Sequence, residues 1–153
     1  MAIRRAKMKA QVVEKLSASA PPGEQFIACV HSETGPSPYL NALFDEVPFL
    51  GLIVALSRKM YFFTLTNTTV VVHSANRWTN RPGEIVVSWP RDQFPVSSYN
   101  RGAVWSKFYV QFPGGSKPTR LNVHRYWRSE LDQLADAFPA SAQPGNGGGT
   151  MAA

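Results

Sequence analysis

The stretch that decides the fold is residues 59–74, which read KMYFFTLTNTTVVVHS. Aromatic and β-branched residues fill both halves of this stretch, and the polar residues Thr66, Asn67 and Thr68 lie between them. Aromatic and β-branched residues favour pleated, half-buried strands. Asparagine tolerates the left-handed backbone that a tight turn requires. The pattern therefore predicts a β-hairpin that opens a longer antiparallel meander.

Further strands are predicted on both sides of this hairpin, at residues 24–31, 84–89, 94–99, 104–112 and 119–123. The first of them has apolar residues on both faces, which indicates that both faces are covered. Pro95 marks residues 94–99 as an edge strand or a bulge. The most regular alternation is at residues 104–112, where one face carries Val104, Ser106, Phe108, Val110 and Phe112.

Two segments have helical periodicity instead. Residues 2–18 are basic in their first half, and the predicted apolar stripe consists of Ile3, Ala6, Ala10, Val13 and Leu16. Residues 125–138 are amphipathic, with an apolar face formed by Trp127, Leu131, Leu134, Ala135 and Phe138.

The chain of 153 residues is long enough for one domain with a hydrophobic core. We expect a basic N-terminal helix and hinge at residues 1–22, a folded domain at 23–139, and a flexible Gly/Ala-rich tail at 140–153. The predicted fold is mainly β, a seven-strand antiparallel sandwich or partial barrel closed by a C-terminal α-helix, with an extra helix at the N-terminus.

This order of elements resembles the bacterial pleckstrin-homology-like domains. Residues 61–72 (YFFTLTNTTVVV) are similar to their strand-turn-strand, and residues 119–128 (TRLNVHRYWR) are similar to their strand-to-helix ending. The resemblance covers residues 23–138 and implies a binding module whose closing helix carries a tryptophan, here Trp127. Members that bind phosphoinositides carry several Lys or Arg around the first two strands, whereas residues 24–57 of this sequence contain none.

The sequence offers little for catalysis. His31, His73 and His124 are far apart, and Cys29 is the only thiol. No His or Cys residues have the close spacing of a zinc site, and no nucleophile or phosphate-loop motif is present. We therefore expect a non-enzymatic protein with no metal and no cofactor. The apolar neighbours of Cys29 indicate a buried thiol.

The formal net charge of +6 suits an acidic partner, although it also aids solubility. The apolar run at residues 47–56 is too short to span a bilayer. It is either buried core or an exposed segment that contacts a partner or an anionic membrane. The candidate contacts for a partner protein or membrane are Arg4, Arg5, Lys7, Lys9, Phe49, Leu50, Ile53, Arg58 and Lys59.

Nucleic acid is a second kind of partner to consider, because single-strand binders combine aromatic faces with cations. The candidate contacts for nucleic acid are Arg77, Trp78, Arg81, Arg101, Trp105 and Lys107. The same pattern also fits a sandwich in which Trp105 and Tyr109 form the second face and the arginines form the rim.

The sequence thus predicts a binding or scaffold module that mediates protein-protein interaction, alone or as a subunit of a larger assembly. The alternatives are a basic nucleic-acid-binding protein and a peripheral membrane-binding module. A lone cysteine and the absence of a secretory signal favour the cytoplasm, with association to the membrane periphery as a variant.

Overall fold

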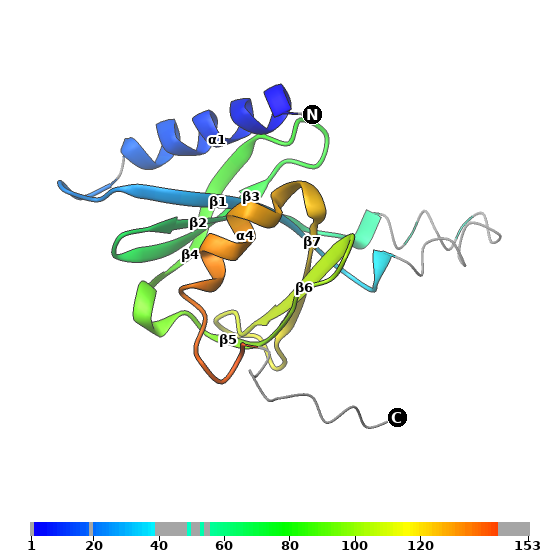
Figure 1. Ribbon diagram of the computed structural model, residues 1–153. Helices are drawn as coiled ribbons and strands as arrows, with labels where there is room; N and C mark the ends of the chain where they lie inside the picture. Colours follow the sequence, from blue (N-terminus) through cyan, green and yellow to red (C-terminus); the bar gives the residue numbers. More distant parts are fainter. Residues whose placement is uncertain (1, 19, 39–48, 50–52, 54–55, 144–153) are drawn as a thin grey trace.

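The structure is a computed structural model that describes residues 2–18, 20–38, 49, 53 and 56–143. It is mainly β, with seven antiparallel strands and a helix at each end (Figure 1), as the sequence predicts. The elements in chain order are α1 (Ala2–Ser17), β1 (Phe26–Thr34), β2 (Met60–Thr66), β3 (Thr69–Ala75), β4 (Pro82–Pro90), the 3-10 helix η2 (Arg91–Gln93), β5 (Val96–Asn100), β6 (Trp105–Val110), β7 (Thr119–His124), the 3-10 helix η3 (Arg125–Trp127) and α4 (Arg128–Ala135).

The strands form one sheet in the order β4-β3-β2-β1-β7-β6-β5. The predicted hairpin is β2 and β3, in register from Met60 opposite Ala75 to Leu65 opposite Val70. β1 joins the two halves of the sheet, because it pairs with β2 along most of its length and with β7 at its end. β4 and β5 are the two edges, so the sheet is not closed into a barrel. The predicted edge strand beside Pro95 is confirmed as β5.

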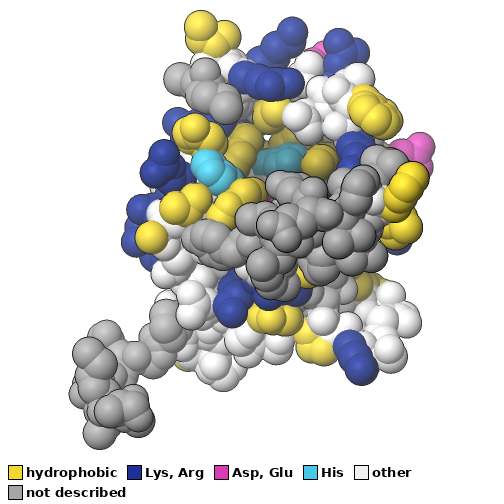
Figure 2. Space-filling model, turned by 90° about the vertical axis from the view of Figure 1, so that its right-hand side faces the viewer, with side chains coloured by type: hydrophobic (Ala, Val, Ile, Leu, Met, Phe, Trp, Pro, Cys, Tyr) yellow, Lys and Arg dark blue, Asp and Glu magenta, His cyan; other side chains and the backbone are white. Residues whose placement is uncertain are grey.

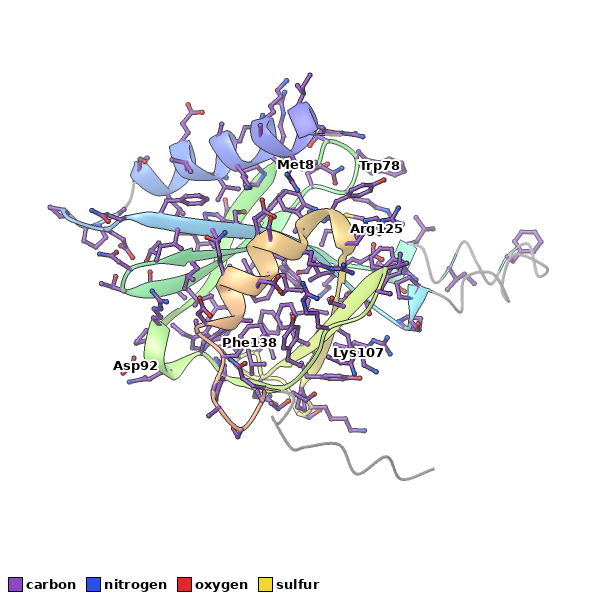
Figure 3. The ribbon with its side chains drawn as sticks, in the orientation of Figure 1. Met8, Trp78, Asp92, Lys107, Arg125 and Phe138 are labelled. Carbon is purple, nitrogen blue, oxygen red and sulfur yellow. The ribbon has the colours of Figure 1, made fainter. Side chains whose placement is uncertain are left out.

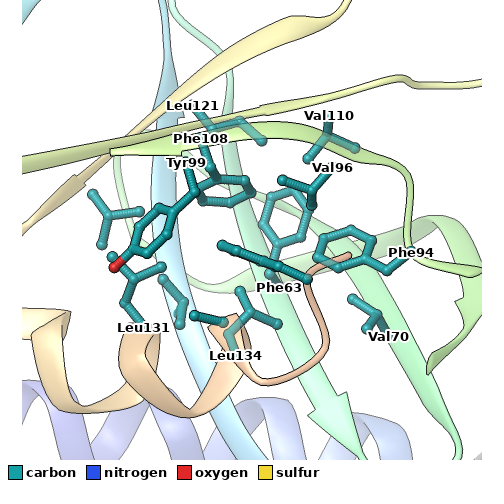
Figure 4. Packing of buried hydrophobic residues seen from close by; sticks show 14 of the residues in the cluster. Phe63, Val70, Phe94, Val96, Tyr99, Phe108, Val110, Leu121, Leu131 and Leu134 are labelled. Carbon is teal, nitrogen blue, oxygen red and sulfur yellow. The ribbon is translucent and has the colours of Figure 1, made fainter. Parts of the chain in front are cut away.

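One face of the bent sheet forms the main core with α4 (Figure 4). Alternate residues of the central strands point into this core, among them Phe63 on β2 and Phe108 on β6. The strand at β6 buries Ser106, Phe108 and Val110, which confirms the predicted alternation. The predicted apolar face of the C-terminal helical segment is also confirmed, since Trp127, Leu131, Leu134, Ala135 and Phe138 are all buried.

Helix α1 covers the opposite face of the sheet. Val12 and Leu16 are buried against Cys29, Phe62 and Val71. β1 is therefore covered on both sides, as its sequence predicts. The predicted stripe of α1 is wrong except for Leu16, because Ile3 is 87% exposed, Ala6 and Ala10 are also exposed, and Val13 is half-buried. The face that packs is the one carrying Met8, Val12 and Leu16, four residues apart, which buries larger side chains than the two alanines.

The chain beyond α4 continues onto the core. Ala142 is buried in the main core, and the side-chain amide of Gln143 donates to the carbonyl of Ala135 (2.8 Å). The rest of the predicted tail lies outside the described residues. Most of the apolar run at 47–56 also lies outside them. Its described residues Phe49, Ile53 and Leu56 are exposed.

Candidate functional site

A pocket opens where the N-terminal half of α1 meets β1, the β3–β4 turn and η3. We call it the corner pocket. Its volume is about 370 Å³, within the range of sites that bind small ligands. Figure 2 looks onto this side of the molecule, where histidine and hydrophobic side chains lie in a recess between Lys and Arg side chains. The pocket is lined by Arg4, Arg5, Met8, His31, Asn80, Tyr126 and Trp127.

Helix α1 is held at this corner by two of its cations. Arg5 donates to the backbone carbonyl of Tyr126, and Lys9 pairs with the buried carboxylate of Glu130. A guanidinium nitrogen of Arg5 also lies 3.8 Å from that carboxylate. Burial raises the pKa of Glu130, but hydrogen bonds from Lys9 and Ser129 outweigh it and hold that pKa below its usual value. Glu130 is thus an ionised link between the two helices, and it fixes one wall of the pocket.

The β3–β4 turn at residues 76–81 is built by Asn76. Its side-chain oxygen accepts from the backbone N–H groups of Trp78 (2.9 Å) and Thr79 (3.0 Å). Asn80 has a positive φ of 53°, which asparagine tolerates better than most residues, and it contributes to the pocket lining. Trp78 is 82% exposed on the outside of the same turn. The guanidinium carbon of Arg77 lies 6.0 Å from the centre of the Trp78 ring.

His31 contributes to the pocket from β1. Its ring centre lies 5.0 Å from that of Phe62 and 6.2 Å from that of Trp127. Nε2 of His31 is buried and has no hydrogen-bond partner among the described residues. Burial lowers the pKa of His31 to about 4, so the ring is neutral at pH 7. The lining between the arginines is therefore uncharged.

The third wall of the pocket is η3, which follows directly from β7. The backbone N–H of Tyr126 donates to Nδ1 of His124 (3.4 Å), and the two ring centres lie 4.4 Å apart. His124 also meets Trp105 edge to face, with ring centres 4.8 Å apart. This row of rings keeps Tyr126 at the mouth of the pocket, where it is 45% exposed.

The structure separates the residues predicted to contact a partner or a membrane. Arg4 and Arg5 line the corner pocket, Lys7 is exposed, and Lys9 is paired with Glu130. Arg58 is largely buried and donates to Glu33 (2.8 Å), whereas Lys59 is exposed. Phe49 and Ile53 are exposed, and Leu50 lies outside the described residues. Among the described residues of this set, Arg4 and Arg5 are the ones that line the pocket.

The residues predicted to contact nucleic acid also lie in two groups. Arg77, Trp78 and Arg81 belong to the turn beside the pocket. Arg101 makes a bidentate ion pair with Asp132 (2.8 and 2.9 Å), and Trp105 packs against His124. Lys107 lies on β6 and lines a second pocket together with Trp105, Arg120 and Asn122. Figure 3 shows Trp78 and Arg125 on the same side of the molecule as the N-terminal end of α1, and Asp92 on the other side.

Sequence reasoning missed Met8, His31, Asn80 and Tyr126 as members of one site. Each of them belongs to a different element, and no local motif joins them. The only signal in the sequence was the basic N-terminal helix, which suggested a contact surface but not where it folds back.

Within the described ranges, no group of three or more His, Cys, Asp or Glu side chains is arranged to hold a metal ion. Cys29 is buried, and this burial raises its pKa to about 12, so it is a thiol rather than a thiolate. No helix in the described part of the chain has the length and apolar content needed to cross a membrane. The corner pocket thus presents cations, an amide, a neutral histidine and apolar surface, which suit binding.

No protein-family model matches this chain, and no curated protein matches it either.

Proposed function

We propose that the protein is a non-enzymatic binding module, similar to the pleckstrin-homology-like domains, that engages an acidic surface of a partner protein. It does so alone or as a subunit of a larger assembly. The observation that carries the proposal is the combination of exposed aromatic residues and cations around the corner pocket. We call this the corner surface. It consists of the corner pocket, whose lining includes Arg4 and Tyr126, and the exposed residues Trp78, Arg81 and Arg125 on the adjoining β3–β4 turn and η3.

The cations of the corner surface support an acidic partner. Arg4, Arg81 and Arg125 have no side-chain partner among the described residues, so their charges are available to a ligand. Arg5 and Lys9, by contrast, are used to hold α1 in place. Cations grouped on one face steer an oppositely charged partner and fix its orientation.

The aromatic residues support a protein as the partner. Trp, Tyr and Arg are the residues most enriched among those that dominate the energy of protein interfaces. Trp78 is the most exposed aromatic side chain in the described part of the chain, and it lies in the turn whose backbone Asn76 holds by hydrogen bonds. A large apolar side chain kept in water is a cost that a partner can relieve.

The order of the strands supports the likeness to pleckstrin-homology-like domains. The chain runs through one half of the sheet, β1 to β4, and then through the other half, β5 to β7, before α4 packs on the concave side. Figure 1 shows α4 across the opening between the two halves. The resemblance suggests binding rather than catalysis, and it does not specify the ligand.

Nucleic acid and membranes are less well supported by the same observations. Two of the six residues predicted to contact nucleic acid have partners within the protein, since Arg101 pairs with Asp132 and Trp105 packs against His124. Arg58, one of the cations predicted to contact a membrane, pairs with Glu33. A protein partner needs neither group.

We expect that replacing Trp78 by alanine weakens the complex with the partner protein at least about tenfold, as expected for a central interface tryptophan. The partner is first captured in extracts of the producing cells with a photo-cross-linking amino acid at position 78. It is then purified, and its affinity for the wild type and for Trp78→Ala is measured by calorimetry. The same amino acid at position 117 is the control, since Lys117 is exposed in the β6–β7 turn, at the far end of β7 from η3.

Capture of the same proteins from positions 78 and 117 would contradict the proposal, as would a purified complex that tolerates Trp78→Ala. Loss of the captured complex after nuclease treatment would replace the protein partner by nucleic acid. Nucleic acid would also show a steep decrease of affinity with salt, because phosphate contacts release counterions.

A further inference from the structure

The corner pocket has an apolar interior beneath a charged rim. Met8 packs against both hydrophobic clusters of the protein and also borders the pocket, and Trp127 is largely buried in the main core beside it. His31 lies next to Trp127 and is neutral at pH 7. A ligand group that enters the pocket therefore meets mostly carbon atoms and no buried charge.

The charges of the pocket are at its rim. Arg4 is exposed and has no side-chain partner within the described ranges, while Arg5 is directed to the carbonyl of Tyr126 and to Glu130. Arg81 and Arg125 do not line the pocket, but both are exposed and are the chain neighbours of the lining residues Asn80 and Tyr126. A ligand whose apolar part fills the pocket would thus have its flanking groups beside arginines.

We propose that the corner pocket is an anchor site for one large apolar side chain, such as leucine, from a peptide segment with acidic residues on both sides of it. The proposal rests on the proposed function and deepens it, because it specifies which part of the acidic partner is recognised. The apolar side chain loses its contact with water in the pocket, and the flanking carboxylates pair with Arg4 and its neighbours at the rim. The apolar anchor supplies affinity and the charges supply orientation.

A nucleobase fits the pocket less well than an apolar side chain. Each base edge carries several hydrogen-bonding groups that must find partners when the base leaves water. Among the lining residues, the uncharged side chains that could meet them are those of Asn80, His31 and Tyr126, and Nε2 of His31 is buried. An aliphatic or aromatic hydrocarbon side chain has no such requirement.

The test compares four probes on the whole protein by calorimetry. The probes are a capped peptide Asp-Glu-Leu-Glu-Asp, the same peptide with serine in place of leucine, the peptide Lys-Lys-Leu-Lys-Lys, and a short oligothymidylate. We expect the acidic leucine peptide to bind about tenfold or more tightly than the serine peptide, which is the effect of burying one leucine side chain. The lysine peptide should not bind. In NMR spectra the leucine peptide should shift the ring signals of His31 and Trp127.

Two variants separate the anchor from the charges. Tyr126→Ala removes a half-exposed wall of the pocket, so it should bring the leucine and serine peptides to within about threefold of each other. Arg4→Glu should weaken both acidic peptides by a similar factor and leave their ratio unchanged. Lys117→Glu carries the same change of charge on a distant turn and should alter neither value beyond about twofold.

Each outcome decides one claim. If the two acidic peptides bind equally and Arg4→Glu weakens both, the anchor is overturned and the proposed function stands. If neither acidic peptide binds, the anchor and the proposed function are both overturned. Tighter binding of the oligothymidylate, lost in Arg4→Glu, overturns the protein partner in favour of nucleic acid. The leucine-to-serine ratio in the wild type decides the anchor even where Tyr126→Ala fails to fold.

Discussion

Replacing Phe63 by alanine is expected to lower the free energy of unfolding by about 4 kcal/mol, the cost typical of a phenylalanine deleted from a core. Phe63 is fully buried at the centre of the main core. Its ring centre lies 5.3 Å from that of Phe108 and 6.0 Å from that of Phe94. These neighbours belong to β6 and to the segment before β5, so Phe63 packs the two halves of the bent sheet together. Its removal would leave a cavity between them. Urea titration with a constant m-value measures the loss.

Trp78→Ala is the control for this prediction, because it also removes a large aromatic side chain. Trp78 is 82% exposed, so its removal should change the free energy of unfolding by no more than about 0.5 kcal/mol. The same variant should weaken partner binding, which separates loss of function from loss of fold. A Phe63→Ala protein that unfolds at the wild-type midpoint would mean that the core does not join the two halves of the sheet as described.

The sequence was a good guide to the strands and to α4, because their folding depends on local periodicity. In β6, every second residue from Ser106 to Val110 is buried, and this period of two is visible without any knowledge of the partner strands. In α4 and the residues around it, the helical spacing of Trp127, Leu131 and Leu134 predicts their burial equally well. Apolar residues on both faces of β1 also predicted correctly that two layers cover it.

The face of α1 was harder to predict, because its helical pattern offers competing stripes. Several apolar residues lie around the helix, and the predicted stripe leaves out Met8. The face that packs is determined by the shape of the sheet beneath it, where Cys29, Phe62 and Val71 leave room for Val12 and Leu16. Such complementarity between distant elements has no signature in a single sequence.

The candidate site could not be predicted for a related reason. Its residues come from α1, β1, the β3–β4 turn and η3, and they meet only after the chain has folded. Glu130 is the clearest example. A glutamate within an amphipathic helix is normally assigned to the solvent face, yet Glu130 is buried because Lys9, 121 residues earlier, neutralises it.

The ion pair between Lys9 and Glu130 provides the second large effect. We expect Lys9→Met to lower the free energy of unfolding by about 2 kcal/mol at pH 7. Removing one partner of a fully buried pair costs roughly 3–5 kcal/mol because the other charge stays unpaired. The loss should be smaller for this pair, because the Lys9 side chain is 32% exposed and Arg5 lies 3.8 Å from the same carboxylate.

This loss should depend on pH in a defined direction. In the wild type, the pKa of Glu130 is lower in the folded state than its ordinary value of 4.5. Its contribution to stability is therefore complete above about pH 4.5 and is lost as the pH falls through the folded-state pKa. Lys9→Met removes a hydrogen bond and a nearby positive charge that both lower this pKa, while the effect of burial, which raises it, remains. The pKa of Glu130 should therefore be higher in the variant, and its ionised form should be less favourable at neutral pH. The difference between wild type and Lys9→Met should thus be largest at pH 7 and shrink by pH 3.

Lys7→Met is the matched control, because Lys7 is exposed on the same helix, has no side-chain partner among the described residues, and loses the same charge. Its free energy of unfolding, measured by urea titration, should stay within about 0.5 kcal/mol of the wild type at both pH values. The double variant Lys9→Met with Glu130→Gln should recover part of the stability lost in Lys9→Met, since it leaves no unpaired buried carboxylate. Equal losses in Lys7→Met and Lys9→Met would show that α1 is held by its general positive charge. The pair with Glu130 would then not be what fixes α1 beside the corner pocket.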